Sequence, residues 1–278
     1  MTPRELLRLM AAELAEAGVP DADVDASLLL SHVTGQNPLN LRLDSWSQVS
    51  LADEEKLRAL CKKRKNRTPL QYLTGVQSFL GRDFYVDERV LIPRPETELL
   101  AERAIATLKG RPSPAALDLC CGSGCLAVSM ALGAPKATVH AADLSEGALA
   151  VTKHNAERLH AKVTLHQGDL FGAIPYGLRF DVIVSNPPYI PAADCLELQE
   201  EVRREPMMAL DGGDDGYDFY RRIAKDAPRF LKEGGVLLLE VGYDQAQGVM
   251  HLCHEAGFRE VMAHEDYQHI ERMVEAKL

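Results

Sequence analysis

The spacing of apolar residues divides this chain into a helical N-terminal part and a longer part in which strands alternate with helices. Within the first 75 residues, apolar side chains recur every three or four positions, as they do in amphipathic helices. We expect Asp23 to cap the second helix, Gly35 to end it, and Ser50 to cap a later one. The core faces predicted for the first two helices are Leu6, Leu7, Leu9, Met10 and Leu14, followed by Leu28, Leu29, Leu30 and Val33.

Residues 76–93 show a different pattern, in which two short apolar segments flank Leu80-Gly81-Arg82. This arrangement is typical of a β-hairpin. We therefore predict a helical domain over residues 1–75, a β-hairpin linker over residues 76–93 and a second domain over residues 94–278.

From residue 115 onward, short apolar runs alternate with amphipathic segments. The predicted strands are Ala115–Cys120, Thr138–Ala142, Lys162–Gln167, Phe180–Ser185, Val236–Val241, Phe258–His264 and His269–Glu275. The runs are apolar along their whole length, which favours a parallel sheet covered on both faces, and the last two lie close enough in sequence to pair antiparallel. The pattern predicts a doubly wound, Rossmann-like α/β sheet, which binds its ligands beyond the carboxyl ends of the strands.

The composition is that of an ordinary folded protein, with 46% hydrophobic and 26% charged residues among 278. No apolar run approaches the roughly 20 residues of a membrane-spanning helix. Arg4, Glu5 and Arg8 stand where an export signal would be apolar, so we expect a cytoplasmic protein that binds no membrane. The six cysteines lack C-x-x-C or Cys/His metal spacing, and we expect them to be reduced and buried, without a metal ion.

The net charge of −10 is concentrated in the second part of the chain. Residues 1–93 hold 12 basic and 13 acidic residues, whereas residues 94–278 hold 19 and 28. This balance argues against a surface that neutralises phosphates, so we expect no stable binding of nucleic acid. The one basic run, Lys62–Arg67, is favoured as a solvated helix end that complements the helix dipole, with contact to an acidic partner as the alternative.

Three of the predicted strands lead into residues suited to a nucleoside ligand. The first strand is followed by Gly122-Ser123-Gly124, and glycines at a helix start let the backbone approach a ligand. Asp143 ends the second strand 19 residues later, where an acid typically accepts hydrogen bonds from ribose hydroxyls. Asp169 follows the third strand and could meet an adenine amino group. The alternatives are tight packing for the glycines, a helix cap for Asp143 and a solvated turn for Asp169.

The fourth predicted strand ends in Asn186-Pro187-Pro188-Tyr189. Neither proline has an N–H, so the loop offers carbonyl acceptors without competing donors. Asn186 adds a side-chain oxygen and Tyr189 a flat ring, which together suit a planar –NH2 group. The alternative is a rigid turn that begins at Asn186. We favour the functional interpretation, because the loop lies on the same sheet edge as the glycine loop.

These two loops resemble those of class I S-adenosylmethionine-dependent methyltransferases that modify amino groups on planar systems. Within that group, three further stretches are similar to the HemK/PrmC family, which methylates the glutamine side chain of peptide chain release factors. They are Gln71–Gly75, Val90–Glu98 and Leu210–Arg222. The order of parts also fits the family: a small all-α N-terminal domain, a hairpin, then the methyltransferase sheet.

The resemblance implies S-adenosylmethionine as cofactor and the glutamine of the release-factor Gly-Gly-Gln sequence as methyl acceptor. It implies that Asn186, Pro187 and Tyr189 are catalytic, with Asn186 Oδ1 and the Pro187 carbonyl each accepting one amide hydrogen. The implied cofactor residues are Cys120, Cys121, Gly122, Ser123, Gly124, Asp143, Asp169, Leu170 and Asn186. The implied substrate residues are Asn186, Pro187, Pro188, Tyr189, Arg94 and Glu96, with Thr97 and Glu98 beside them, although the acids are equally suited to the start of a helix.

One departure concerns the first loop, where the family has a glycine at the position of Cys120. The cysteine puts in doubt any need for a positive φ at that position. An amide nitrogen is a poor nucleophile, because its lone pair is shared with the carbonyl. The expected catalysis is therefore positioning of the amide without a dedicated base.

Three other functions fit parts of the pattern. A nucleic-acid amino-methyltransferase also uses Asn-Pro-Pro-Tyr, on a flipped base, but needs a basic groove or a recognition domain. A dehydrogenase fits the sheet but leaves Asn186–Tyr189 without a role. A non-catalytic protein that binds release factor or ribosome would keep the cofactor only for stability. We expect a monomeric methyltransferase whose partner is a release factor.

Overall fold

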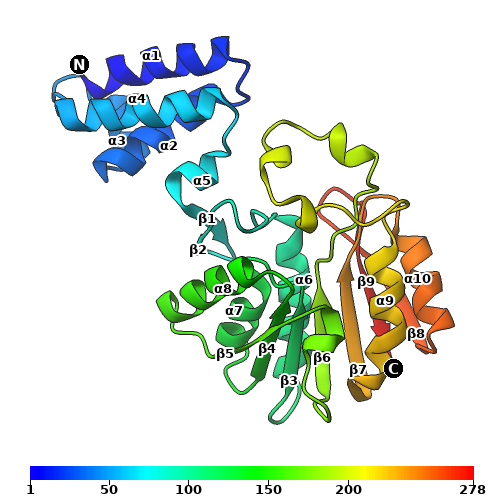
Figure 1. Ribbon diagram of the computed structural model, residues 1–278. Coiled ribbons are helices and arrows are strands. Elements are labelled where there is room, and N and C mark those ends of the chain that lie inside the picture. Colours follow the sequence, from blue (N-terminus) through cyan, green and yellow to red (C-terminus); the bar gives the residue numbers. More distant parts are fainter. The chain divides into compact units, whose positions relative to one another are not determined.

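The computed structural model describes residues 1–278 and divides into two compact units. The first unit comprises residues 1–76 together with the short segment 199–204, and the second comprises residues 77–198 and 205–278. The first unit is helical (blue to cyan in Figure 1). Its helices are α1 (Pro3–Glu16), α2 (Ala22–Thr34), α3 (Pro38–Leu43), α4 (Leu51–Lys65) and α5 (Leu70–Thr74).

The core of the first unit follows the predicted apolar faces with two exceptions. Leu6, Met10 and Leu14 are buried, whereas Leu9 and Leu28 are exposed on the solvent side of α1 and α2. The helix positions explain this, because apolar residues at adjacent or alternate positions cannot all lie on one face of a helix with 3.6 residues per turn.

The caps of the helical unit differ in part from the prediction. Asp23 lies inside the first turn of α2, and the residue before the helix is Asp21, in a left-handed conformation. Ser50 does cap α4, by accepting a hydrogen bond from the Asp53 N–H. Gly35 ends α2 as predicted. Helix α3 was not predicted, because six residues contain too little periodicity to detect.

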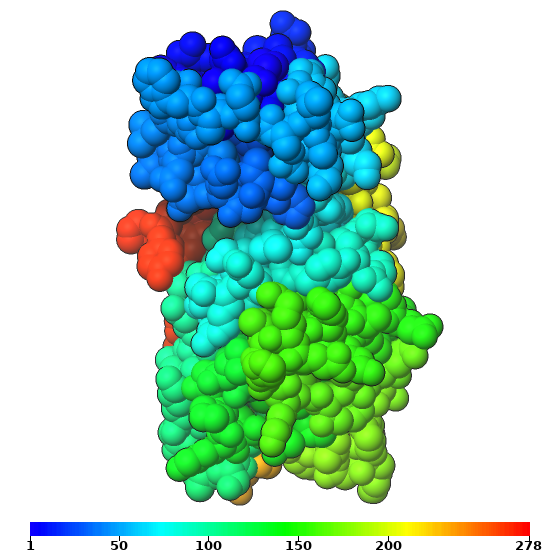
Figure 2. Space-filling view, turned by 90° about the vertical axis from the view of Figure 1, so that its left-hand side faces the viewer, coloured from blue at the N-terminus to red at the C-terminus, as the bar shows by residue number.

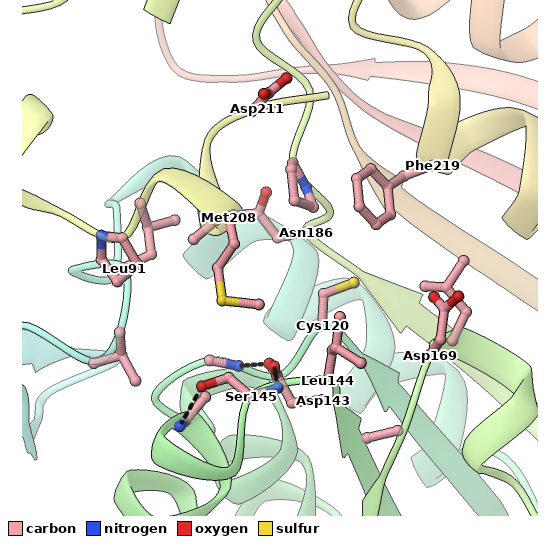
Figure 3. Close-up of a pocket in the computed structure, with 18 of the residues that line it drawn as sticks. Leu91, Cys120, Asp143, Leu144, Ser145, Asp169, Asn186, Met208, Asp211 and Phe219 are labelled. Atoms are coloured by element: carbon pink, nitrogen blue, oxygen red, sulfur yellow. Dashed lines mark hydrogen bonds between the residues drawn. The ribbon is translucent and has the colours of Figure 1, made fainter. Parts of the chain in front are cut away.

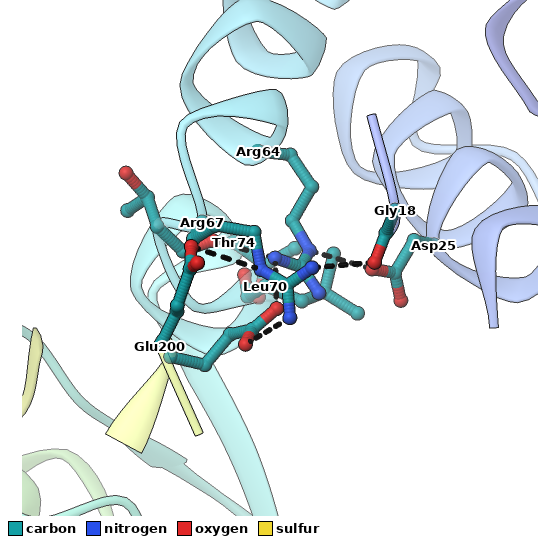
Figure 4. Close-up of polar contacts among 9 residues, drawn as sticks. Gly18, Asp25, Arg64, Arg67, Leu70, Thr74 and Glu200 are labelled. Atoms are coloured by element: carbon teal, nitrogen blue, oxygen red, sulfur yellow. Dashed lines mark hydrogen bonds and ion pairs between the residues drawn. The ribbon is translucent and has the colours of Figure 1, made fainter. Parts of the chain in front are cut away.

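A buried ion-pair network holds segment 199–204 within the helical unit (Figure 4). Arg64 donates from Nε to Asp25 at 2.6 Å and from Nη1 to Glu201 at 2.8 Å. Arg67 donates to the other oxygen of Glu201 at 2.6 Å. Two members of the basic run are therefore structural, which corrects the interpretation of the whole run as a solvated helix end. Its Lys62 and Lys63 are exposed.

Replacing Arg64 should destabilise the helical unit strongly. Arg64→Ala leaves Asp25 buried without its partner, so we expect the free energy of unfolding to fall by about 3–5 kcal/mol. The matched control is Arg58→Ala, which removes an exposed pair with Glu54 at 2.8 Å on the same helix and should cost less than about 1 kcal/mol. Denaturant unfolding followed by circular dichroism measures both, and equal losses would contradict the assignment.

The second unit is a seven-stranded sheet covered by helices on both faces (Figure 1). The strand order is β5-β4-β3-β6-β7-β9-β8, and only β9 runs in the opposite direction to the other six strands. The strands are β3 (Ala115–Leu119), β4 (Thr138–Asp143), β5 (Val163–Gln167), β6 (Phe180–Ser185), β7 (Leu231–Glu240), β8 (Glu260–Glu265) and β9 (Glu271–Lys277). The doubly wound sheet and the antiparallel final pair are confirmed, although β7 begins five residues earlier than predicted.

Two separate cores fix the helices to the sheet. One face packs against α6 (Glu96–Lys109), α7 (Cys125–Gly133) and α8 (Glu146–Arg158), and the other against α9 (Asp218–Asp226) and α10 (Ala246–Glu255). The chain passes from β3 to β4 and β5 on one side, then returns to β6 and β7 on the other. The switch in strand order therefore lies beside β3, where sheets of this type bind ligands.

The hairpin of β1 (Val76–Phe79) and β2 (Arg82–Tyr85) is packed into the second unit. Phe79 and Phe84 are buried against the core helices, with ring centroids 5.9 Å apart in an edge-to-face contact. The Tyr85 N–H donates to Asn155 on α8 at 2.7 Å. In Figure 2, cyan atoms lie directly against green ones. The segment predicted as a linker thus contributes to the core. No helix combines the length and the apolar character needed to cross a membrane.

Candidate active site

A cavity of about 360 Å³ lies at the carboxyl edge of the sheet, beside the switch in strand order (Figure 3). Residues from the ends of four neighbouring strands meet there. From the loops after β3, β4, β5 and β6 they are Cys120, Gly122, Asp143, Leu144, Ser145, Gly168, Asp169, Leu170, Asn186 and Pro188. The size is in the range of small-molecule sites.

The loop after β3 is held in a left-handed conformation. Cys120, Gly122 and Gly124 all have positive φ, at 59°, 52° and 77°. The doubt about a positive φ at Cys120 is therefore wrong, and this cysteine occupies a conformation that glycine would adopt more cheaply. At Gly124 only glycine fits, because a Cβ would lie 2.6 Å from the Thr152 side chain. At Gly122 nothing lies within 4 Å of that position, so the backbone is open to a ligand.

Asp143 fastens this loop to the start of α8. Its two carboxylate oxygens accept hydrogen bonds from the N–H groups of Gly122 and Ser145, each at 2.9 Å. Burial raises the pKa of Asp143, and these backbone donors oppose the rise. The predicted ligand role and the alternative of a helix-start contact are thus compatible, since each carboxylate oxygen has a further lone pair.

Buried polar groups on α8 also hold the loop. Thr152 donates to the carbonyl oxygen of Gly122 at 2.9 Å. The Asn155 side chain donates to the carbonyl oxygens of Ser123 and Tyr85, each at 2.9 Å, and so joins the loop to the hairpin. Sequence reasoning missed Thr152 and Asn155, because their roles appear only when α8 lies against the loop.

The three thiols near this loop are not nucleophiles. Burial raises the pKa of Cys120, Cys121 and Cys125, that of Cys125 to about 12. All three therefore remain neutral near pH 7, and a covalent thiol mechanism does not fit the site. Cys120 lines the cavity as an apolar wall, whereas Cys121 and Cys125 belong to the core behind it.

Asp169 lies on the rim of the cavity rather than inside it. Its carboxylate is half exposed and pairs with Arg222 of α9 at 2.6 Å. Leu170, the next residue, is buried and has a positive φ of 47°. The structure thus places Asp169 near the expected ligand, with a partner that the sequence did not predict.

The Asn186 side chain is held in a defined orientation. Ser185 Oγ donates to the carbonyl oxygen of Leu119 at 2.8 Å, which fixes the end of β6 to β3. Asn186 Nδ2 donates to Thr97 Oγ1 on α6 at 3.2 Å. The nitrogen end of the carboxamide is therefore turned toward Thr97, and Asn186 Oδ1 is the end that remains for a ligand. Asn186 and Pro188 line the cavity.

Tyr189 and Pro187 belong to the same loop as Asn186. Tyr189 packs at the edge of the second core, and its carbonyl oxygen accepts from Gln245 Nε2 at 2.9 Å. Burial raises the pKa of its phenol. Pro187 is buried, and neither residue is among those that line the cavity. The contact expected between the Tyr189 ring and a planar –NH2 group stays a prediction.

The stretch Leu210–Arg222 braces the Asn-Pro-Pro-Tyr loop. The Ile190 N–H donates to the carbonyl oxygen of Leu210 at 3.0 Å, and the Gly212 N–H donates back to Ile190 at 2.8 Å. A Cβ at Gly212 would lie 2.7 Å from the Tyr189 Cα, so this approach requires glycine. Farther along the stretch, Phe219 and Arg222 reach the cavity itself.

Of the substrate residues predicted before α6 and in its first turn, only Thr97 contacts Asn186. Arg94 pairs with the buried Glu205 at 2.5 Å, and Glu205 also accepts from the Ile92 N–H at 2.9 Å. Glu98 accepts from the hairpin N–H of Leu80 at 2.8 Å. Neither Arg94 nor Glu96 lines the cavity. The cavity residues that sequence reasoning missed include Arg89, Leu144, Ala148 and Pro206, together with Met207–Ala209, which form a 3₁₀ helix too short to show periodicity.

The chain resembles characterised proteins over its whole length. Two family models match, the PrmC N-terminal domain at residues 5–75 and the methyltransferase small domain at residues 96–205. A release factor glutamine methyltransferase of Geobacter sulfurreducens is 43% identical over 280 residues, covering 100% of this chain and 97% of the relative. A release factor glutamine methyltransferase of Bordetella pertussis is 44% identical over 260 residues, covering 94% of this chain and 96% of the relative. The chain belongs to the release factor glutamine methyltransferase family.

Solved structures of other methyltransferases share the fold of this chain. A methyltransferase from Pyrococcus furiosus has a TM-score of 0.54 at 19% identity, covering 78% of this chain and 98% of that one. Another match is a Thermus thermophilus 16S rRNA N2 G1207 methyltransferase in complex with AdoMet and guanosine. It has a TM-score of 0.53 at 21% identity, covering 73% of this chain and 49% of that one. The predicted class I methyltransferase fold is confirmed.

The cavity fits the S-adenosylmethionine that this family uses. Gly122 leaves an open backbone edge, and Asp143 presents a carboxylate beside it. Leu144, Leu170 and Phe219 supply apolar walls of the kind that hold a purine. Figure 3 shows Asp143 and Asp169 on opposite sides of Cys120, with Asn186 above them.

Asp143→Ala should weaken cofactor binding while leaving the fold intact. The change frees the N–H groups of Gly122 and Ser145 and removes the carboxylate, which should cost about 1–3 kcal/mol of binding free energy. Isothermal titration calorimetry with S-adenosylmethionine measures this. Glu146→Ala, which removes an exposed carboxylate three residues away outside the cavity, is the control and should bind normally. Unchanged affinity in Asp143→Ala would remove Asp143 from the cofactor site.

Proposed function

We propose that this chain transfers the methyl group of S-adenosylmethionine to the side-chain amide nitrogen of the glutamine in the Gly-Gly-Gln sequence of peptide chain release factors. The observation that supports this most directly is the orientation of Asn186, whose Nδ2 is turned toward Thr97 so that Oδ1 is available to an –NH2 group. The names of the full-length relatives point to the same substrate.

The cofactor supplies an electrophilic methyl group on a sulfonium centre, which needs no further activation. We assign its binding to the backbone of Cys120–Gly124, to Asp143, and to Asp169 with Leu170. We add Phe219 as an adenine-facing wall and Arg222 as the residue that holds Asp169.

The protein contributes by holding the substrate amide. We propose that Asn186 Oδ1 accepts one amide hydrogen and the Pro187 carbonyl accepts the other, which aims the nitrogen lone pair into the cavity. Orientation of this kind can be worth up to about 7–11 kcal/mol of the barrier. Pro188 forms the adjacent wall and cannot donate a competing N–H. Tyr189 supports this loop from behind, through its packing in the core.

No general base is needed in this scheme. No histidine lines the cavity, and the thiol of Cys120 is held neutral. The amide nitrogen becomes acidic once it is methylated, so its proton can leave to water. Met207 and Met208 lie at the cavity wall and provide apolar cover over the reacting groups.

We propose that the helical unit recognises the body of the release factor, and that the protein acts as a monomer in the cytoplasm, where release factors work. The exposed Lys62 and Lys63 are suited to an acidic surface. A nucleic-acid amino-methyltransferase is the second candidate, because Asn-Pro-Pro-Tyr also suits a flipped base. The excess of acidic residues after position 93 disfavours it.

Substrate identity can be tested directly. Incubation with labelled S-adenosylmethionine and either release factor or nucleic acid should label only the release factor. Mass mapping should then place the methyl group on the Gly-Gly-Gln glutamine, and label in the nucleic acid alone would overturn the proposal.

Asn186→Ala should lower kcat strongly and change cofactor binding little. The substitution removes one of two orienting acceptors but leaves the loop after β3 untouched, which is the pattern of an interaction made mainly in the transition state. Asn186→Asp should retain more activity, because a carboxylate still accepts. Single-turnover methylation of a Gly-Gly-Gln fragment measures both variants. A rate near that of the wild type for Asn186→Ala would show that the motif serves only as a turn.

Removal of residues 1–75 should separate recognition from chemistry. The core of the helical unit is distinct from the two cores of the sheet unit, so we expect the shortened protein to bind S-adenosylmethionine. It should methylate a short Gly-Gly-Gln peptide yet lose turnover on whole release factor. The peptide is the internal control for folding, and undiminished turnover on whole release factor would contradict the recognition role.

A further inference from the structure

Gln245 is a buried polar residue that the proposed reaction does not use. It lies just before α10, and only 4% of the residue is exposed. Its Nε2 donates to the carbonyl oxygens of Tyr189 at 2.9 Å and Gly216 at 3.3 Å, and its Oε1 accepts from the Gly242 N–H at 3.0 Å. Gln245 does not line the cavity. One side chain thus joins three separate segments of backbone.

Two of these segments lead to residues that line the cavity. Tyr189 ends the loop that starts at Asn186, and Asn186 is part of the cavity wall. Gly216 precedes Phe219, which lines the cavity from α9. The Gln245 carboxamide therefore lies between the loop proposed to hold the substrate amide and the stretch that braces this loop.

The backbone around this carboxamide is shaped for close approach. A Cβ at Gly216 would lie 2.4 Å from the Tyr189 carbonyl oxygen and 2.8 Å from Gln245 Nε2. A Cβ at Gly242 would lie 2.7 Å from Gln245 Oε1. Both positions therefore require glycine, which lets the backbone approach a neighbouring group closely. The residues on two sides of Gln245 are thus fitted to its hydrogen bonds.

The Asn-Pro-Pro-Tyr loop depends on support at its two ends. Its prolines have no N–H with which to hold the chain in place. At the start, Ser185 fixes the end of β6, and at the other end Gln245 holds the carbonyl group of Tyr189. The direction of the Pro187 carbonyl follows from how the peptide units on either side of it are fixed. A free Tyr189 carbonyl would allow the second half of the loop to rotate.

We infer that Gln245 is a positioning residue, which holds the Asn-Pro-Pro-Tyr loop in the orientation that methyl transfer to an amide requires. It lies outside the cavity and acts through the Tyr189 carbonyl. The inference deepens the proposed function and rests on it for the role of this loop in holding the substrate amide. The hydrogen bonds of Gln245 are a property of the folded chain and can be probed without turnover.

Two variants disturb this contact from opposite sides. Gln245→Met keeps an unbranched side chain of similar length but removes the donor to Tyr189 and Gly216. Gly216→Ala keeps Gln245 and places a Cβ where the Tyr189 carbonyl and Gln245 Nε2 now meet. Both variants should therefore produce the same defect, although only one of them changes the glutamine.

The matched control is Asp181→Ala, at the opposite end of β6 from Asn186. Asp181 accepts from the Ala115 N–H at 2.8 Å and pairs with Arg111 at 3.0 Å and with Lys232 at 2.6 Å. Its removal destabilises the same sheet at the edge away from the cavity. Thermal unfolding measures the stability of all variants and shows which loss is comparable.

Single-turnover methylation of a Gly-Gly-Gln peptide at saturating S-adenosylmethionine gives a rate constant and an amplitude, which is the fraction of enzyme that reacts. Gln245→Met and Gly216→Ala should lower the rate constant by about tenfold or more at unchanged amplitude, because the amide is held less well. Asp181→Ala should keep the rate constant within about twofold, since it lies far from the loop. A purely structural role for Gln245 would lower only the amplitude, and that result overturns the inference.

Hydrogen exchange followed by mass spectrometry separates this inference from the proposed reaction. The N–H groups of Ile190 and Gly212 are bonded across the loop and its bracing stretch. Their exchange should be about tenfold faster in Gln245→Met than in the wild type, and unchanged in Asp181→Ala. If the wild type fails to methylate the peptide but exchange responds in this way, the reaction is wrong and the support of the loop by Gln245 stands. Unchanged exchange in Gln245→Met overturns the inference.

Discussion

The hydrogen bond from Asn186 Nδ2 to Thr97 is the contact on which the rest of the site depends. A carboxamide has one donating end and one accepting end of nearly the same shape, so packing alone does not choose between them. In this structure Thr97 Oγ1 accepts from the Nδ2 end, which leaves Oδ1 on the cavity side. Because Thr97 lies in the first turn of α6, this choice joins the loop after β6 to a helix packed on one face of the sheet.

The architecture around this contact supplies rigidity from several directions. Ser185 fixes the end of β6 to β3, and the stretch after Leu210 fixes the loop from the opposite side. On the cofactor side, Asp143 and Asn155 hold the loop after β3 in place. Each support is a hydrogen bond to backbone, which keeps the loop atoms in position. This is what a reaction driven by orientation requires.

Backbone strain is also present where the proposed ligand would lie. Cys120 has a φ of 59°, a conformation that disfavours a residue with a Cβ by roughly 1–2 kcal/mol. Asp143 and Glu240 are carboxyl groups whose burial raises their pKa. Local rules are often broken at functional sites and compensated by the surrounding fold. Here the compensation comes from backbone donors at Asp143.

The sequence by itself determined the doubly wound sheet, its antiparallel final pair and the edge where the ligand site lies. These follow from apolar periodicity and from residues placed directly after strands, which are local properties. Asp143 and Asn186 could be identified for the same reason. Only the tertiary structure decided that Tyr189 packs against the second core, that Arg94 pairs with Glu205, and that Thr97 accepts a hydrogen bond from Asn186. Those facts depend on contacts between residues about 50 to 150 positions apart, and side-chain direction across such separations is set by packing, which no local pattern in the sequence encodes.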